Sequence, residues 1–337
     1  MKVYQYIIRR LLLMVPVLFG VTIITFIISH LVPGDPARLL AGPHAPLEVV
    51  LAVRTKMGLD KPLYEQFFIY LNDLLHGDLG TSITTRRAVL ADLMRFFPAT
   101  FELTLSAMVL SIVVGIPLGV ASATRQNTLP DHLSRIFALA GVATPVFWSG
   151  LMVLLVFYYD LGVLPGPGRI DIGIVSPPQI TGLYVVDSIL TGNLAALGSS
   201  LGHLILPTVV LAFSTLGTIV RMVRSSMLEV LREDYVVMAK AKGLPERDVV
   251  YKHALKNALT ATITLVGLIF GALLSGAVLV EAIFSWPGVG RYAVNAIEYV
   301  DFAAVMGYTL IVTLIYITVN LGVDVFYALL DPRVRLE

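Results

Sequence analysis

The stretch DYVVMAKAKGLPERDVVYKHALKNAL, at residues 234–259, is polar and basic, whereas the sequence around it is mostly apolar. Of the 24 Lys and Arg residues in the chain, 8 lie between Arg221 and Lys256. Apolar segments long enough to cross a membrane flank this stretch on both sides. In a membrane protein, such a charged segment is either a docking element for a soluble partner or an amphipathic helix that lies on anionic lipid.

The composition identifies the class of protein that carries this stretch. Hydrophobic residues make up 57% of the 337 residues and charged residues 14%, whereas soluble domains average roughly 45–50% and about 25%. We therefore expect an all-α integral membrane protein with several spans. A net charge of +1 gives no general attraction to nucleic acid, and the lack of Cys excludes disulfides, thiolate metal sites and a Cys nucleophile.

Six apolar windows are long enough to be transmembrane helices, since a span needs about 20 residues. They are residues 11–31, 101–123, 136–161, 204–223, 262–280 and 303–330. The first resembles a signal peptide, but its core is too long and no small-residue cleavage site follows, so we interpret it as a retained span. Pro117 and Pro145 are expected to kink the second and third spans.

The Lys and Arg residues are distributed unevenly between the two sides of the membrane that these spans define. Fifteen lie on the side of the termini and the 221–256 loop, and nine on the other side, most of them in one long segment. Because basic loops stay in the cytoplasm, both termini and that loop are predicted to be cytoplasmic. Residues 32–99 and 160–203 are then external, and residues 63–75 could form a short amphipathic helix.

This topology suggests two parts. Residues 1–99 would hold the first span and an external segment, and residues 100–337 a core transmembrane domain with a cytoplasmic coupling loop at 224–259.

The basic stretch itself has the start and stop signals of two helices. Asp234 is expected to cap a helix over residues 235–242, which Gly243 ends by adopting a left-handed conformation. Pro245 suits the first turn of a second helix. That helix has one apolar face: Val250, Ala254, Leu255, Ala258 and Leu259. Small residues leave the surface of the first helix smooth enough to enter a groove on another protein: Ala239, Ala241 and Gly243.

This element resembles the cytoplasmic loop of permease subunits of binding-protein-dependent ABC importers. Gly243 and Ala239 match the pattern of that loop, whereas Val237 and Met238 replace its Glu and first Ala, as is usual in the peptide-importer branch. Further stretches are similar to the first dipeptide permease subunit of the dipeptide/oligopeptide/nickel permease family. They are RRLLLMVPVLFGVTIITFIISHLVPGDP (9–36), GLDKPLYEQFFIYLNDLLHGDLGTS (58–82), RMVRSSMLEVL (221–231), VEAIFSWPGVGR (280–291) and VNLGVDVFYALLDPRVR (319–335).

The resemblance implies a type I ABC importer permease fold with six transmembrane helices, in the plasma membrane of a bacterium or archaeon. It also implies four partners besides lipid and the peptide substrate: a second homologous permease, two ATPase subunits and an extracytoplasmic substrate-binding protein. ATP and Mg would bind to the ATPases, and this chain would bind no cofactor. The residues expected to couple the chain to the ATPases are Asp234, Tyr235, Ala239, Ala241, Lys242, Gly243 and Leu244.

Polar and small residues inside the spans are further candidates. Asp324, with Asn320 one turn earlier, could contact the substrate or a gate, although a hydrogen bond to another helix is the favoured interpretation. Gly267 and Gly271 have the spacing of close helix packing and could also line the gate. Gly115 and Gly119 have the same spacing.

The external ends of the spans hold two acidic residues and a turn. Glu102 and Glu281 are expected to be satisfied by solvent or loop groups. The turn contains candidates for contact with the binding protein: Trp286, Gly288 and Gly290.

Other functions have less support. The chain has no Gly-x-x-x-x-Gly-Lys phosphate loop and no His-Glu-x-x-His, so we expect no catalysis by this chain. Its six His residues lack metal-ligand spacing, so no metal site is expected. A secondary transporter acting without ATPases is a remote alternative, because such a protein would carry more buried charges along its spans. The expected substrates are dipeptides or short oligopeptides, with nickel, haem or glutathione as alternatives.

Overall fold

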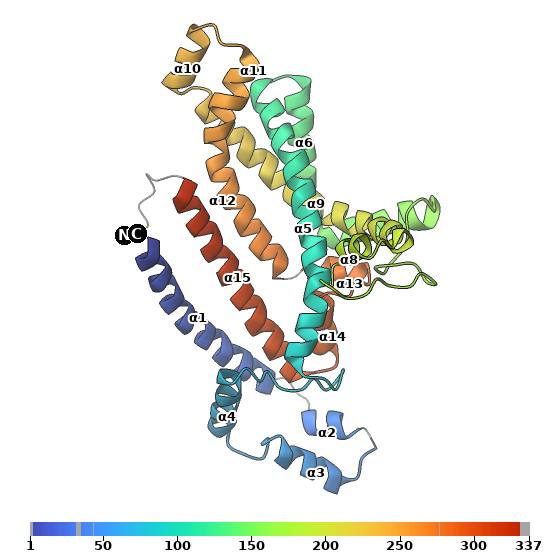
Figure 1. The fold of residues 1–337 in the computed structure, drawn as a ribbon. Helices are drawn as coiled ribbons and strands as arrows, with labels where there is room; N and C mark the ends of the chain where they lie inside the picture. The colour runs from blue at the N-terminus through green and yellow to red at the C-terminus, as the bar shows by residue number, and fades with distance from the viewer. Residues whose placement is uncertain (1–2, 32–34, 43, 276, 331–337) are drawn as a thin grey trace.

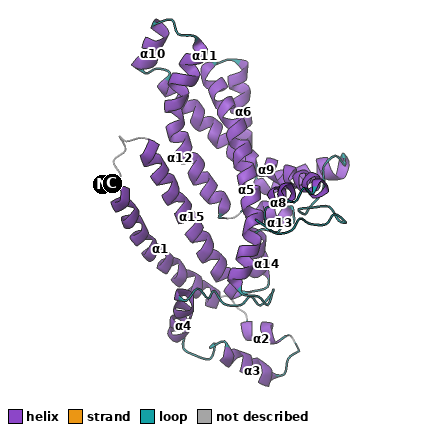
Figure 2. Cartoon of the chain, in the orientation of Figure 1, coloured by secondary structure: helices purple, strands orange, loops and turns teal. Residues whose placement is uncertain are grey.

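The computed structural model describes residues 3–31, 35–42, 44–275 and 277–330, and most of them are helical (Figures 1 and 2). The described residues form no strand, and their only β-pairing is an isolated antiparallel bridge between Thr81 and Ala88. The predicted all-α class is confirmed.

Among the described residues, five helical stretches are long and apolar enough to cross a membrane. They are α1 (Val3–Leu31), α5 (Val89–Thr124), α9 (Leu194–Val230), α15 (Phe302–Leu330) and the stretch that runs through α11 (Glu246–Asp248), the π-helix η2 (Val249–Ala254) and α12 (Leu255–Leu274). With 36 residues, α5 is about 54 Å long, whereas the hydrocarbon core is about 30 Å thick. Its ends therefore extend into the polar layers.

The third expected span is broken. Helix α6 (Leu129–Ala143) is followed after Thr144 and Pro145 by α7 (Val146–Val153) and the π-helix η1 (Leu154–Asp160), and the chain bends by 102° at this break. Pro145 has no N–H to donate, and Thr144 before it is extended, as steric contact with a proline ring favours. The kink expected at Pro145 is therefore a sharp bend, and the helix before it begins seven residues earlier than the window at 136–161.

Helix α9 is the centre of the bundle. In its most apolar window 72% of the residues are buried, against 11% for α15. Gly119 of α5 brings these two helices close, since a Cβ at Gly119 would lie 2.6 Å from the Cβ of Val223. Gly115 likewise faces Ile219, so the predicted packing role of this glycine pair is confirmed. On another side of α9, Gly217 lies against the Ala138 carbonyl of α6.

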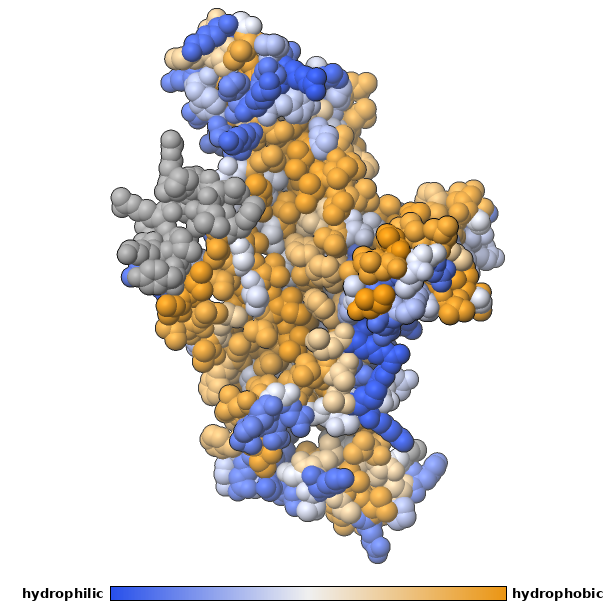
Figure 3. Space-filling view, viewed as in Figure 1, coloured by the Kyte–Doolittle hydropathy of each residue, from blue (hydrophilic) through white to orange (hydrophobic). Residues whose placement is uncertain are grey.

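Shorter helices lie at the other end of the bundle and at its side, away from α10 (Asp234–Ala241), as Figure 1 shows. They are α2 (Pro36–Ala41), α3 (Leu47–Lys56), α4 (Leu63–Leu75), α8 (Tyr184–Leu190), α13 (Val278–Ile283) and α14 (Val289–Glu298). Helix α4 has the bounds predicted for it. On the face in Figure 3, hydrophilic residues gather at the two ends of the molecule, with a broad hydrophobic band between them, as expected for a protein that crosses a membrane.

Candidate functional site

The basic stretch forms two helical segments joined at Gly243. Helix α10 begins at Asp234, and Glu233 precedes it without a side-chain capping bond. The prediction that the Asp234 carboxylate caps this helix is therefore wrong: Asp234 is the first helical residue, where its charge still complements the helix dipole.

The end of α10 follows the prediction. Gly243 has φ +75°, which glycine adopts without steric cost, and a Cβ there would meet no atom within 4 Å. The N–H of Gly243 donates to Lys240 O and that of Leu244 to Ala239 O. These two bonds define a Schellman motif, which satisfies carbonyls at the end of the helix. Pro245 is the N-cap residue of α11, with a non-helical ψ of 140°, so it precedes the first helical turn in which it was expected.

Most of the predicted coupling residues are exposed on this element. Asp234, Tyr235, Ala241, Lys242, Gly243 and Leu244 are all exposed. Ala239 is the exception, because it is buried with Val236 against Val249 of η2. The expectation that Ala239 contributes to a smooth outer surface is therefore wrong. Its small side chain lets α10 pack closely on the helix that follows.

Helix α10 exposes apolar side chains among its charged ones, which the sequence argument missed. Val237 is 53% exposed and Met238 is 58% exposed, with Tyr235 and Leu244 beside them in the element. We call these four residues the α10 apolar face. Val237 and Met238 stand where the family pattern has other residues, and their exposure in a segment outside the spans could have been foreseen from that replacement. Exposed apolar clusters of this kind mark protein interaction sites.

A hydrogen bond and the packing of the helices that follow attach α10 to the bundle. The Nδ2 of Asn257 donates to the Tyr235 hydroxyl over 2.6 Å. In the following helices, Val250, Ala254 and Ala258 are buried against α5 and α9, on residues such as Val223. The predicted apolar face of the second helix is thus confirmed for these three residues. A displacement of α10 would therefore be transmitted to α5, α9 and α12.

The glycines of α12 face α15. A Cβ at Gly267 would lie 2.1 Å from Val323 Cγ2, and one at Gly271 would lie 3.3 Å from Asn320 Oδ1. The structure thus supports the packing interpretation of this glycine pair. Asn320 Oδ1 is buried at this contact and accepts no hydrogen bond from the described residues.

Asp324 lies one turn after Asn320 on α15, and its carboxylate contacts α1. The Tyr6 hydroxyl donates to Asp324 Oδ2 over 2.8 Å, and Arg10 Nη2 lies 3.1 Å from the same oxygen. The favoured interpretation, a hydrogen bond to another helix, is what the structure shows. Asp324 therefore fastens the start of α1 to the end of α15, and the structure does not bring it together with Gly267 or Gly271.

The turn after α13 is buried. Trp286 is 1% exposed and donates through Nε1 to Ala99 O over 2.8 Å. Gly288 and Gly290 surround the carboxylate of Glu281, with which a Cβ at either position would collide. The burial of these three residues gives no support to their predicted contact with a binding protein, which stays untested.

The carboxylate of Glu281 stabilises this tight turn through the hydrogen bonds that it accepts. It is fully buried and accepts from the Thr100 hydroxyl (2.6 Å) and from Arg291 N (2.9 Å). Burial raises the pKa of Glu281, and these donors oppose that effect. Protein groups, and not solvent, thus satisfy this carboxyl group.

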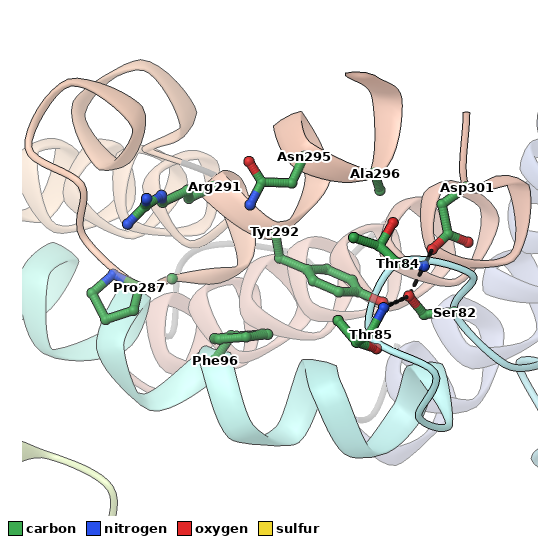
Figure 4. Close-up of a pocket in the computed structure, with 11 residues that line it drawn as sticks. Ser82, Thr84, Thr85, Phe96, Pro287, Arg291, Tyr292, Asn295, Ala296 and Asp301 are labelled. Atoms are coloured by element: carbon green, nitrogen blue, oxygen red, sulfur yellow. Dashed lines mark hydrogen bonds between the residues drawn. The ribbon is translucent and has the colours of Figure 1, made fainter. Parts of the chain in front are cut away.

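A pocket of about 140 Å³ lies beside this turn (Figure 4). The ring of Tyr292 lies at its centre and packs on Phe96, with ring centroids 5.5 Å apart. Arg291 lies towards one end of the pocket and Asp301 towards the other. Asp301 accepts from the Ser82 hydroxyl over 2.6 Å and from a backbone amide, so its charge is largely compensated. The sequence offered no signal that residues 82–85 and 287–301 meet here.

Comparison with known proteins shows the family to which this chain belongs. Residues 115–336 match the family model of the binding-protein-dependent transport system inner membrane component. Residues 3–104 match the N-terminal model of the same kind of membrane component. The chain therefore belongs to the family of inner membrane components of binding-protein-dependent transport systems.

Individual relatives cover nearly the whole chain. A probable D,D-dipeptide transport system permease of Escherichia coli K12 is 51% identical over 95% of this chain and 94% of its own length. A dipeptide transport system permease of Alkalihalophilus pseudofirmus is 45% identical over 98% and 99%. A glutathione transport system permease of Escherichia coli is 38% identical over 99% of both chains.

Proposed function

We propose that this chain is a transmembrane subunit of an ATP-driven importer that moves dipeptides or short oligopeptides across the plasma membrane. The observation that carries the proposal is the α10 apolar face, exposed on a helix outside the spans and packed onto the bundle. Dipeptides are the first choice of substrate because the two most similar of the relatives above are named for dipeptide transport. Glutathione is the second choice, from a relative of lower identity.

In this proposal, α10 docks into separate ATPase subunits on the cytoplasmic side, and both termini lie on that side. The excess of Lys and Arg around residues 221–256 supports this orientation. ATP binding and hydrolysis belong to the ATPases, since the sequence has no phosphate loop of its own. A second homologous permease forms the other wall of the pathway, and an extracytoplasmic binding protein delivers the peptide.

The contacts of α10 suggest how the energy is transferred. When the ATPases move α10, the packing of Val236 and Ala239 on Val249 passes the movement to η2 and α12. Buried Ala254 and Ala258 pass it on to α5 and α9. Alternating access then requires that the ATPases favour one state of the bundle when ATP is bound, because equal affinity for both states shifts no equilibrium.

Peptide uptake in proteoliposomes tests this function. Liposomes with this chain, the second permease, the ATPases and the binding protein should take up dipeptide only when ATP is supplied on the ATPase side. Ala241→Trp places bulk at an exposed position, and Gly243→Arg adds a side chain where the backbone φ of +75° disfavours one. Both variants should abolish uptake while the chain still inserts into the membrane. Uptake driven by an ion gradient in liposomes with this chain alone would contradict the proposal and favour a secondary transporter.

A further inference from the structure

A groove of about 490 Å³ opens between α6 and α9, towards the end of the bundle that carries α10. Neither the basic stretch at residues 234–259 nor the pocket around Tyr292 includes any of its residues. Its lining consists of His132, Arg135, Ile136 and Leu139 from α6 and of Arg221 and Arg224 from α9. Three of these six residues are arginines and two are aliphatic, so the groove is both basic and apolar.

One of the three arginines is already neutralised. Arg224 donates through Nε to Asp131 Oδ1 over 2.8 Å and through Nη2 to Oδ2 over 3.0 Å. Asp131 is fully buried, and it also accepts from the Ser122 hydroxyl over 2.6 Å. This bidentate pair fixes α6 to α9, and its Arg224 lines the groove.

The other cations have no such partner. Among the described residues, no carboxylate pairs with Arg135 or Arg221, and both side chains are exposed. His132 lies beside them on α6 and is also exposed. The groove therefore presents two uncompensated guanidinium groups to whatever fills it, and guanidinium groups bind phosphate oxygens through paired hydrogen bonds.

The apolar part of the groove points to the kind of anion. Ile136 is 65% exposed and Leu139 is 62% exposed. They follow Arg135 along α6, in the direction of the membrane-spanning part of the bundle. A small hydrophilic anion would leave these side chains uncovered, whereas a phospholipid would cover them with its acyl chains.

We propose that this groove binds an anionic phospholipid, with the phosphate on Arg135 and Arg221 and the acyl chains along Ile136 and Leu139. Basic pockets between transmembrane helices bind anionic headgroups by the same combination of charge and apolar contact. The bound lipid would join α6 to α9 close to the point where α9 leads into α10.

Native mass spectrometry of the purified full-length chain with added phosphatidylglycerol tests the site. Arg135→Gln combined with Arg221→Gln removes the two free cations and leaves the Arg224–Asp131 pair intact. Arg125→Gln combined with Arg232→Gln is the matched control, because it removes two exposed cations at the same end of the molecule but outside the groove. We expect about tenfold weaker lipid retention in the groove variant than in the control.

Each alternative gives a different result. Equal losses in both variants would mean that lipid responds only to the overall basic charge of this end, which would overturn the proposal. Competition by glycerol phosphate as strong as by phosphatidylglycerol would identify a site for a free phosphate compound instead of a lipid. A photoreactive residue in place of Leu139 should crosslink to lipid in the assembled complex. Exclusive crosslinking to another protein would also overturn the proposal.

Discussion

Arg169 Nη2 lies 2.5 Å from Glu102 Oε2, and both side chains are more than nine-tenths buried. The same guanidinium nitrogen donates to Gly182 O, and the guanidinium lies 3.8 Å from the centre of the Tyr184 ring. The carboxylate also accepts from Val185 N over 2.8 Å. This ion pair therefore attaches the segment between η1 and α8 to α5.

Removing one partner of this pair should destabilise the protein strongly. Glu102→Gln leaves the Arg169 charge buried and unpaired, which costs about 3–5 kcal/mol in comparable cases. Glu102→Leu combined with Arg169→Met should recover much of that loss, because it leaves no buried charge. Thermal unfolding of the purified chain in detergent measures both. A single variant as stable as the wild type would show that the pair does not hold the segment.

Gly267 should not tolerate even one added methyl group. In Gly267→Ala the new Cβ would overlap Val323, a β-branched residue with little rotamer freedom, and we expect a loss of about 1–3 kcal/mol. Val323→Ala should restore stability. Gly322→Ala in α15 is the control, since a Cβ there meets nothing within 4 Å. If both glycine variants unfold at the same temperature, α12 and α15 are not packed as described.

Acidification should loosen the region around α8 through Asp187. Burial opposes its ionisation, but the Thr181 hydroxyl and the backbone amides of residues 180–182 outweigh this and lower its pKa below the ordinary 3.8. A carboxyl group with a lowered folded pKa contributes stability above pH 3.8, and the contribution is lost as the pH falls through the folded pKa.

Hydrogen exchange of residues 180–190, measured from pH 6 down to about pH 3, checks this effect. Protection should fall at the acid end in the wild type. In Asp187→Asn, protection should be weaker at every pH and should no longer depend on pH through this group. An unchanged pH profile in the variant would show that another group is responsible.

Much of the fold could be predicted because its signals are local. Hydropathy locates the long helices, and Gly243 and Pro245 mark the break in the basic stretch. The break after α6 was harder, because a proline predicts a kink but its angle depends on the α7 and α13 packing that follows. Contacts such as Arg169 with Glu102 join residues 67 positions apart, and neither periodicity nor composition contains that information.

In the candidate site as well, features with a local signal could be predicted from the sequence, whereas tertiary contacts could not. Exposure of Asp234 and Lys242 followed from their charge, whereas the inward position of Ala239 depends on how α10 folds back onto Val249. For Asp324, its position within an apolar span suggested a partner on another helix, but only the tertiary structure identifies that partner as Tyr6 and Arg10 of α1. A buried turn such as the one at Trp286 cannot be distinguished from an exposed loop by its sequence.

The association of the ATPases with this chain tests the central claim most directly. Val237→Asp combined with Met238→Asp charges the α10 apolar face without touching the buried contacts of the helix. Tyr64→Asp combined with Leu75→Asp is the control, since both residues are exposed on α4 at the other end of the molecule. We predict that the ATPase subunits copurify with the wild type and the control but not with the α10 variant. Full retention of the ATPases by the α10 variant would contradict the claim that this face receives the force for transport.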